Sequence, residues 1–179
     1  MDYKLNIGNL LPEFQAKDHE NYTVSDEDII GTPLVLFFYP KDCTSGCTKE
    51  ACAFQKHMEE FDNLDVLVLG ISPDNLSSHQ KFIQENKLEF TLLSDPDHKM
   101  AKSFDVLRDG KIQRTTFLLD ATGMIRWIER PVEVEGHAER VLEAVKKHIP
   151  KEHISKLMGD VEKNFSDFLK ESPRKKPKK

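Results

Sequence analysis

The sequence predicts an α/β fold in which a central mixed sheet is flanked by helices. Two observations predict this class: short apolar runs typical of buried strands alternate with segments of helical periodicity, and a turn late in the chain joins two strands into a hairpin. The chain has 179 residues, enough for one domain with a hydrophobic core and a short appendage. With 38% hydrophobic and 32% charged residues, it is neither a collagenous nor a low-complexity chain.

The first predicted strand is an unbroken apolar run at 34–39 (LVLFFY). Because polar residues do not alternate with apolar ones, it is expected to be a central strand buried on both faces, and Pro40 ends it. A polar, turn-rich loop follows at 41–46, and apolar residues then recur at helical spacing over 50–61. A short loop therefore joins this strand to a helix.

The remaining elements continue the alternation of strands and helices. In order, we predict a strand at 65–71, a helix at 77–86 capped by Ser72 and Asp74, a strand at 91–94, a helical turn at 99–104, a strand at 116–120, a turn at 121–123, a hairpin strand at 124–129 and a final helix at 136–148 that Pro150 stops. Strands separated by helices, with one hairpin near the end, describe a thioredoxin-like fold.

The domain is expected to span 1–150, with two segments after it. Residues 151–171 carry apolar residues along one helical face, so an additional amphipathic helix that packs back on the domain is predicted. Residues 172–179 (SPRKKPKK) contain no hydrophobic side chain, so nothing offsets the entropy of ordering them and a disordered basic tail is expected.

Charge is distributed unevenly along the chain. The net charge is -5, yet the last ten residues hold six basic residues and one acidic residue. An acidic body with a basic tail is not a nucleic-acid-binding domain. The tail is either a solubilising end or an element for nuclear localisation or nucleic-acid tethering. No membrane-spanning run and no secretory signal is apparent, so no membrane partner and a cytoplasmic location are expected, or a nuclear one if the tail acts as a localisation signal in a eukaryote.

Three cysteines, Cys43, Cys47 and Cys52, lie within ten residues, and the rest of the chain has none. An odd cysteine count without distant partners does not build a disulfide framework, so thiol chemistry or a metal is the leading explanation. Cys47 stands at the predicted helix start, where free N–H groups favour the thiolate. A lone cysteine would more simply be a buried apolar residue, but three at one junction favour chemistry.

The spacing of Cys47 and Cys52 restricts what the pair can do. Five residues of continuous helix separate their Cα atoms by ~8 to 9 Å, whereas a disulfide needs about 4.4 to 6.8 Å. The two residues are therefore either independent thiols or a redox pair whose bond requires the first turns of the helix to unwind.

The segment from Pro40 to Cys52 (PKDCTSGCTKEAC) resembles the active-site loop of peroxiredoxins, most closely the peroxiredoxin Q or bacterioferritin comigratory protein group. Pro40, Thr44 and Cys47 meet the Pro-x-x-x-Thr-x-x-Cys spacing of that family, and Cys52 resembles the resolving cysteine of the group. Further along, the segment that begins at Arg114 (RTTFLLD) resembles the one that carries the family's active-site arginine, and EGHA at 135–138 resembles the start of its last helix.

This resemblance implies a thiol-dependent peroxidase with an antioxidant role in cell redox homeostasis, acting on hydrogen peroxide and organic hydroperoxides. The Cys47 thiolate would become a sulfenic acid, Cys52 would resolve it as an intramolecular Cys47–Cys52 disulfide, and thioredoxin or a similar dithiol protein would reduce the disulfide. No metal or other cofactor is implied, and the group leans towards a monomer. The implied supporting roles are peroxide orientation for Thr44, charge stabilisation for Arg114, shielding of the thiolate for Pro40, and an ion pair with Arg114 for Glu50.

Simpler interpretations of two of these residues stay open. Arg114 could be an exposed arginine before a strand, and Glu50 could only complement the helix dipole. Ser45 stands where the family commonly has proline, which should make the loop less rigid. Cys43 is not required by the motif and is either a spectator or a secondary resolving thiol.

Two other functions compete with the peroxidase. Copper chaperones of the SCO type use a Cys-x-x-x-Cys pair and a distant histidine on a thioredoxin-like fold, and Cys43 and Cys47 have that spacing. Arg114 stands where a histidine would be needed, and its cation would repel a metal. A general disulfide reductase would use Cys-x-x-Cys, which the chain lacks.

Overall fold

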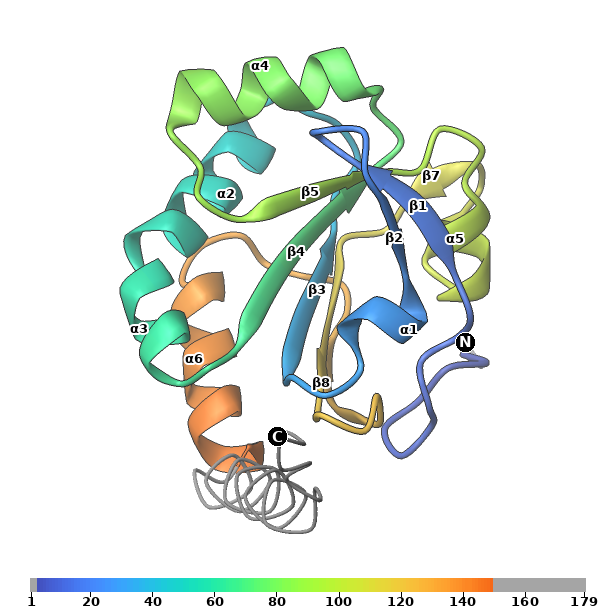
Figure 1. Cartoon of the computed structure of the whole chain (residues 1–179), viewed down its shortest axis with the longest axis vertical. Coiled ribbons are helices and arrows are strands. Elements are labelled where there is room, and N and C mark those ends of the chain that lie inside the picture. Colours follow the sequence, from blue (N-terminus) through green and yellow to red (C-terminus); the bar gives the residue numbers. More distant parts are fainter. Residues whose placement is uncertain (1–2, 150–179) are drawn as a thin grey trace, which may run out of the picture. The chain divides into compact units, whose positions relative to one another are not determined.

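The computed structural model describes residues 3–149, and every structural statement below refers to them (Figure 1). Met1–His148 form one compact unit. The predicted helix at 151–171 and basic tail at 172–179 lie outside the described residues.

A mixed sheet of seven strands forms the centre of the fold, as predicted. Its strands, in spatial order, are β2 (Thr23–Ser25), β1 (Gln15–Asp18), β5 (Thr91–Ser94), β4 (Leu67–Ser72), β3 (Leu34–Phe38), β8 (Thr115–Leu119) and β9 (Ile125–Glu129). Strands β3, β4 and β5 run parallel, whereas β1 and β8 pair with them in the antiparallel sense. The predicted hairpin is the antiparallel pair of β8 and β9.

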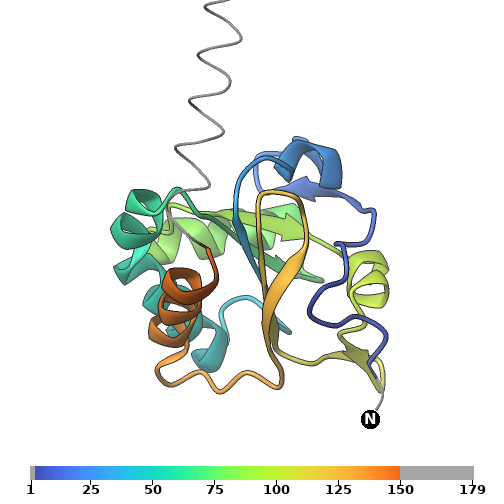
Figure 2. The same ribbon diagram turned by 90° about the horizontal axis from the view of Figure 1, so that it is seen from below.

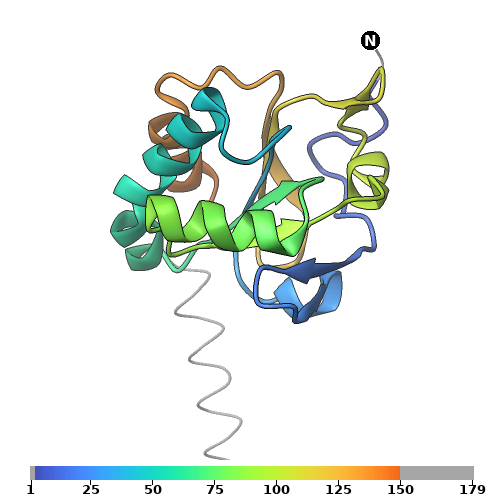
Figure 3. The same ribbon diagram turned by 90° about the horizontal axis from the view of Figure 1, so that it is seen from above.

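Helices lie on both faces of this sheet. The helices are α1 (Asp26–Ile29), α2 (Ser45–Lys56), α3 (Met58–Asn63), α4 (Leu76–Asn86), α5 (Lys99–Ser103) and α6 (His137–His148). Figures 2 and 3 show α2, α3, α4 and α6 on one face and α5 on the other. The loop at 41–44, called the catalytic loop below, connects β3 to α2, and α2 lies on the sheet face that carries four helices.

Strand β3 is buried on both faces, which confirms the prediction from its unbroken apolar run. The Phe37 ring stacks on Phe54 of α2 at 4.6 Å between centroids. The neighbouring Phe38 packs on Phe104, just after α5, at 5.2 Å. Alternate residues thus pack against opposite helical layers, which fixes the end of β3 and the loop that follows it.

The structure corrects the sequence prediction at three points. The helix expected over 50–61 is broken at His57, whose backbone is no longer helical, so it forms α2 and α3. The cap of α4 is Asn75, whose side chain accepts a hydrogen bond from the Ser78 N–H, rather than Ser72 or Asp74. Five elements were not predicted, because they are short and carry little apolar periodicity. They are β1, β2, α1 and the two-residue strands β6 (Leu107–Arg108) and β7 (Lys111–Ile112).

Candidate active site

The site begins at the N-terminus of α2, which Thr44 caps. The Thr44 hydroxyl accepts a hydrogen bond from the Cys47 N–H at 3.3 Å and donates one to the Lys41 carbonyl at 3.3 Å. Cys47 is the third residue of the helix and is 1% exposed. Its sulfur therefore lies at the end of the helix where free N–H groups and the helix dipole favour negative charge.

Arg114 reaches Cys47 from the start of β8. Its Nη2 donates a hydrogen bond to the Cys47 sulfur at 3.0 Å. Gly46 makes this approach possible, because a Cβ at that position would lie 3.1 Å from Nη2.

Glu50 holds the other edge of the guanidinium. Arg114 Nη1 donates to Glu50 Oε2 at 2.5 Å, and the Glu50 side chain is 1% exposed. Glu50 follows Cys47 by nearly one helical turn, so the two residues share a helix face. One guanidinium therefore bridges one oxygen of a buried carboxylate and the buried Cys47 sulfur by direct contacts.

His137 is a member of this cluster that the sequence reasoning missed. Its Nδ1 lies 3.0 Å from Glu50 Oε1, without the alignment of a hydrogen bond, and the side chain is fully buried. The ring packs edge to face on Phe54 at 5.2 Å. The signal available in the sequence was the position of His137 at the start of the last predicted helix.

The second cysteine of the motif stands apart from this cluster. Cys52 is partly buried, and its sulfur lies 3.7 Å from Oδ1 of Asn86 at the end of α4. Cys47 and Cys52 are free thiols, and α2 runs without interruption through both. A bond between them therefore requires part of α2 to unwind.

Pro40 of the motif and the additional Cys43 lie between β3 and α2. Pro40 is partly buried and lies two residues after the end of β3. Cys43 is exposed, has a left-handed backbone (φ 58°), and its sulfur lies 3.9 Å from the Glu85 carboxylate. Burial, followed by the Glu85 charge, raises the pKa of the Cys43 thiol above its usual value. This environment favours the protonated thiol, which is a poor metal ligand and a poor nucleophile.

The copper alternative gains no support from this geometry. Between residues 3 and 149, no three His, Cys, Asp or Glu side chains are grouped so that they could hold a metal ion. The group next to Cys47 is the Arg114 cation rather than a histidine. In the same part of the chain, no helix is both long and apolar enough to span a membrane.

Comparison with known proteins agrees with the sequence resemblance. The profile of the AhpC/TSA family matches residues 7–128. Peroxiredoxin Bcp of Bacillus subtilis is 39% identical over 150 residues, which cover 79% of this chain and 96% of that protein. The similarity therefore extends over nearly the whole length of this relative.

Two solved structures share the fold. A cysteine-to-serine mutant of Xylella fastidiosa PrxQ has a TM-score of 0.79 and 33% identity, covering 83% of this chain and 100% of that one. The bacterioferritin comigratory protein of Xanthomonas campestris, described by its alkyl peroxide reduction activity, has a TM-score of 0.75 and 33% identity, covering 82% and 99%. The thioredoxin-like fold is thereby confirmed, and the chain belongs to the AhpC/TSA family, in its peroxiredoxin Q and Bcp group.

Proposed function

We propose that this chain, a thiol peroxidase by its family, uses Cys47 as the peroxidatic cysteine. The observation that carries the assignment is the hydrogen bond from Arg114 Nη2 to the Cys47 sulfur at the capped N-terminus of α2. A cationic donor and a helix N-terminus together stabilise the thiolate and the negative charge that develops as the peroxide bond breaks.

In the first step the Cys47 thiolate attacks one peroxide oxygen. A sulfur–oxygen bond forms, the oxygen–oxygen bond breaks, and the leaving hydroxide or alkoxide takes up a proton to become water or an alcohol. The sulfur is oxidised by two electrons to sulfenic acid, and the peroxide is reduced. Thr44 orients the peroxide, Arg114 stabilises the leaving oxygen, Glu50 positions Arg114, and Pro40 limits the access of water.

In the second step the Cys52 sulfur attacks the sulfenic sulfur of Cys47. A disulfide forms, the sulfur–oxygen bond breaks, and the oxygen leaves as water. Thioredoxin or a similar dithiol protein then reduces the disulfide by exchange. The whole cycle uses thiols alone and needs no metal or organic cofactor.

Hydrogen peroxide and organic hydroperoxides are the proposed substrates. The alkyl peroxide reduction described for the Xanthomonas campestris relative supports the organic class. A monomer with no nucleic-acid partner and a cytoplasmic location remain predictions, and the relatives named above do not support the nuclear alternative.

The decisive experiment is peroxide consumption with a thioredoxin reducing system. Cys47→Ser should abolish turnover, and Cys52→Ser should accumulate sulfenic or overoxidised Cys47 in intact-mass spectra. Cys43→Ser is the matched control and should retain turnover. Undiminished peroxide consumption by Cys47→Ser would overturn the assignment of Cys47, and a metal-free wild type that binds copper(I) tightly but consumes no peroxide would restore the copper alternative.

A further inference from the structure

A buried carboxylate, Asp42, lies in the catalytic loop at 41–44 and accepts several hydrogen bonds, although none of the roles described above involves it. It is 3% exposed. Its Oδ1 accepts from the Tyr39 hydroxyl at 2.7 Å, and its Oδ2 accepts from the Ser78 hydroxyl at 2.8 Å. Burial, followed by the Asp42 charge, raises the pKa of Tyr39 well above its usual value, so the phenol keeps its proton and donates it.

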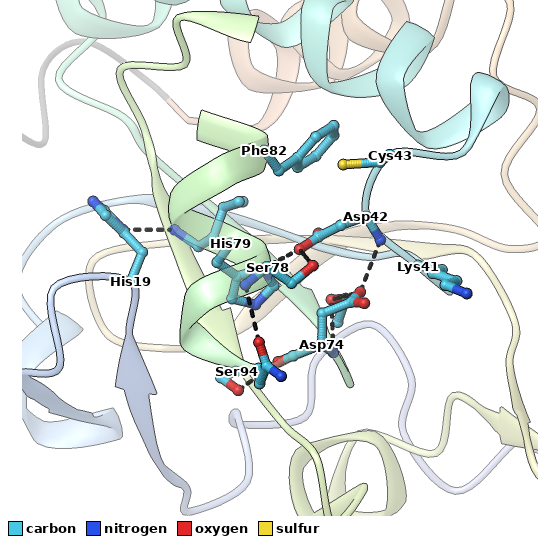
Figure 4. Close-up of polar contacts among 12 residues, drawn as sticks. His19, Lys41, Asp42, Cys43, Asp74, Ser78, His79, Phe82 and Ser94 are labelled. Carbon is cyan, nitrogen blue, oxygen red and sulfur yellow. Dashed lines mark hydrogen bonds and ion pairs between the residues drawn. The ribbon is translucent and has the colours of Figure 1, made fainter. Parts of the chain in front are cut away.

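The fourth member of this network is His79 of α4, whose ring is fully buried. Its Nε2 lies 3.1 Å from the Leu93 carbonyl oxygen, which only accepts, so Nε2 carries a proton. Its Nδ1 lies 2.8 Å from Asp42 Oδ2, at hydrogen-bond distance. Figure 4 shows Asp42 pointing toward both Ser78 and His79. The network therefore connects the loop after β3 with α4 and with β5.

The backbone of Asp42 is held as well. Its N–H donates to Asp74 Oδ2 at 2.8 Å, and the same carboxylate oxygen accepts from the Ser72 hydroxyl at 2.7 Å (Figure 4). The Ser94 hydroxyl donates to the Asp74 carbonyl at 2.5 Å. Asp42 is thus held by its side chain and by its backbone. Its partner Asp74 is bonded in turn to the ends of two neighbouring parallel strands, β4 and β5.

Two of the three cysteines downstream of Asp42 have only weak polar contacts. Cys43 is exposed and has only a long contact from its sulfur to Glu85. Cys52 likewise has only a long contact to Asn86. Cys43 and Cys52 are therefore weakly held, whereas Cys47 between them is buried and hydrogen-bonded to Arg114. The first weakly held residue after Asp42 is thus Cys43, at the entry to α2.

We propose that Asp42 and His79 are positioning residues that anchor the upstream end of the catalytic loop on α4, so that the unwinding needed for the disulfide begins after Asp42. The anchor favours the folded conformation, in which Arg114 reaches the Cys47 sulfur, over the unwound conformation, in which Cys52 reaches it. This inference rests on the proposed Cys47–Cys52 disulfide.

The proposal predicts opposite effects on the two steps. Weakening the anchor lowers the population that reacts with peroxide and raises the population that forms the disulfide. Loss of one hydrogen bond to a buried charge should speed disulfide formation by about tenfold. Sulfenic acid formation should slow by a smaller factor, because the folded conformation is the major one and its population changes less. Faster disulfide formation also leaves the sulfenic acid exposed to a second peroxide for less time, so overoxidation should fall.

The test is single-turnover quenched flow with intact-mass detection on Asp42→Asn and on Ser78→Ala, which removes one hydrogen bond and is the less disruptive change. Sulfenic acid formation should be slower and disulfide formation faster than in the wild type. Ser77→Ala, at an exposed neighbouring position of α4, is the matched control. Equal slowing of both steps, or no change in either, would overturn the proposal, since a purely structural defect has no reason to accelerate the second step.

His79 is tested by comparing two substitutions. Asn at this position keeps a donor close to the place of Nδ1, whereas Leu keeps only the bulk. His79→Asn should stay closer to wild type in both rate constants than His79→Leu does. Equal behaviour of the two variants would remove His79 from the anchor.

A measurement on the reduced protein separates this inference from the proposed function. Amide hydrogen exchange at the start of α2 needs neither peroxide nor disulfide, and it should be faster in Asp42→Asn and Ser78→Ala than in Ser77→Ala. Unchanged exchange would overturn the anchor even if the disulfide forms. Faster exchange in a protein that forms no Cys47–Cys52 disulfide would instead support the anchor and refute the assignment of Cys52.

Discussion

The reactivity of Cys47 depends on the position of one guanidinium group. Arg114 donates through Nη2 to the Cys47 sulfur and through Nη1 to Glu50 Oε2. The carboxylate leaves only one edge of the guanidinium for the sulfur, and it neutralises part of the cation's charge. These two effects oppose each other, and the structure favours positioning, because Glu50 is buried and its carboxylate accepts directly from Arg114.

Glu50→Gln should therefore lower kcat/KM for peroxide by about tenfold, roughly the effect of one charge-assisted hydrogen bond. The measurement is peroxide consumption at limiting substrate, with Glu59→Gln at an exposed position of α3 as the control. An unchanged or higher kcat/KM would mean that charge neutralisation, rather than positioning, is the main effect of Glu50.

Gly46 offers a second test, because its substitution by alanine should lower activity without lowering stability. An alanine Cβ would lie 3.1 Å from Arg114 Nη2, so the guanidinium must move by a few tenths of an ångström. Gly46→Ala should slow the reaction of Cys47 with peroxide. Because alanine is favoured over glycine in helices by up to about 1 kcal/mol, the thermal midpoint should stay equal or rise. A variant with lower stability and unchanged peroxide reactivity would contradict this account.

At the residue scale, local spacing predicts part of the site. Pro40, Thr44, Cys47 and Glu50 lie within one short segment, so a motif can identify them, and the structure brings Thr44, Glu50 and Arg114 around Cys47. Their chemical roles stay predictions.

The histidines could not be found in this way. The partner of His79 lies 37 residues away in the chain, and His137 meets Glu50 only after α6 packs on α2. No local pattern encodes such a contact.

At the scale of elements, apolar periodicity predicted the strands and helices that bury the most apolar side chains. Strand β3 and helix α4 were found close to their observed bounds. The break between α2 and α3 was missed, because Phe54, Met58 and Phe61 are all buried and keep the helical period across it. Strands β1 and β2 were missed because they are short and each carries polar residues on its exposed positions.

The start of α2 makes a prediction about flexibility. Ser45 is the first helical residue, where proline is favoured, and Thr44 before it already has the extended backbone that a residue before proline adopts (φ -80°, ψ 153°). Ser45→Pro should therefore stabilise the reduced protein by about 0.4 to 1 kcal/mol by reducing the entropy of the unfolded chain. The same rigidity opposes the unwinding that Cys52 needs, so the disulfide should form more slowly.

The measurements for Ser45→Pro are chemical unfolding of the reduced protein and the fraction of overoxidised Cys47 after repeated turnover. The overoxidised fraction should rise, because the sulfenic acid survives longer before Cys52 reaches it. Greater stability with unchanged overoxidation would show that unwinding of the first turn does not limit disulfide formation.

At the scale of the whole molecule, one histidine connects the two helices that support the site. His57, at the break between α2 and α3, lies with Nδ1 2.7 Å from Glu60 Oε1 and with Nε2 3.3 Å from Glu139 Oε1 on α6. The hydrogen bond with Glu60 is the largest cause that raises the pKa of His57 above its usual value, and the bond with Glu139 adds to it. His57 lowers the pKa of Glu60 in turn, and Lys146 also faces Glu60 at 3.6 Å.

The pH dependence of stability follows from the raised pKa of His57. Since the folded protein binds the His57 proton more tightly than the unfolded chain, the stabilisation is complete below about pH 6.5 and is lost as the pH rises through the folded pKa. The loss should be less than about 1 kcal/mol, because the two carboxylates are largely exposed and screened by water. Urea unfolding of wild type and His57→Gln at pH 6 and pH 8 measures it, and the difference between the two proteins cancels the titration of other groups. Wild type should exceed the variant by more at pH 6 than at pH 8; an equal difference at both values would mean that the contact between α2 and α6 does not depend on the His57 charge.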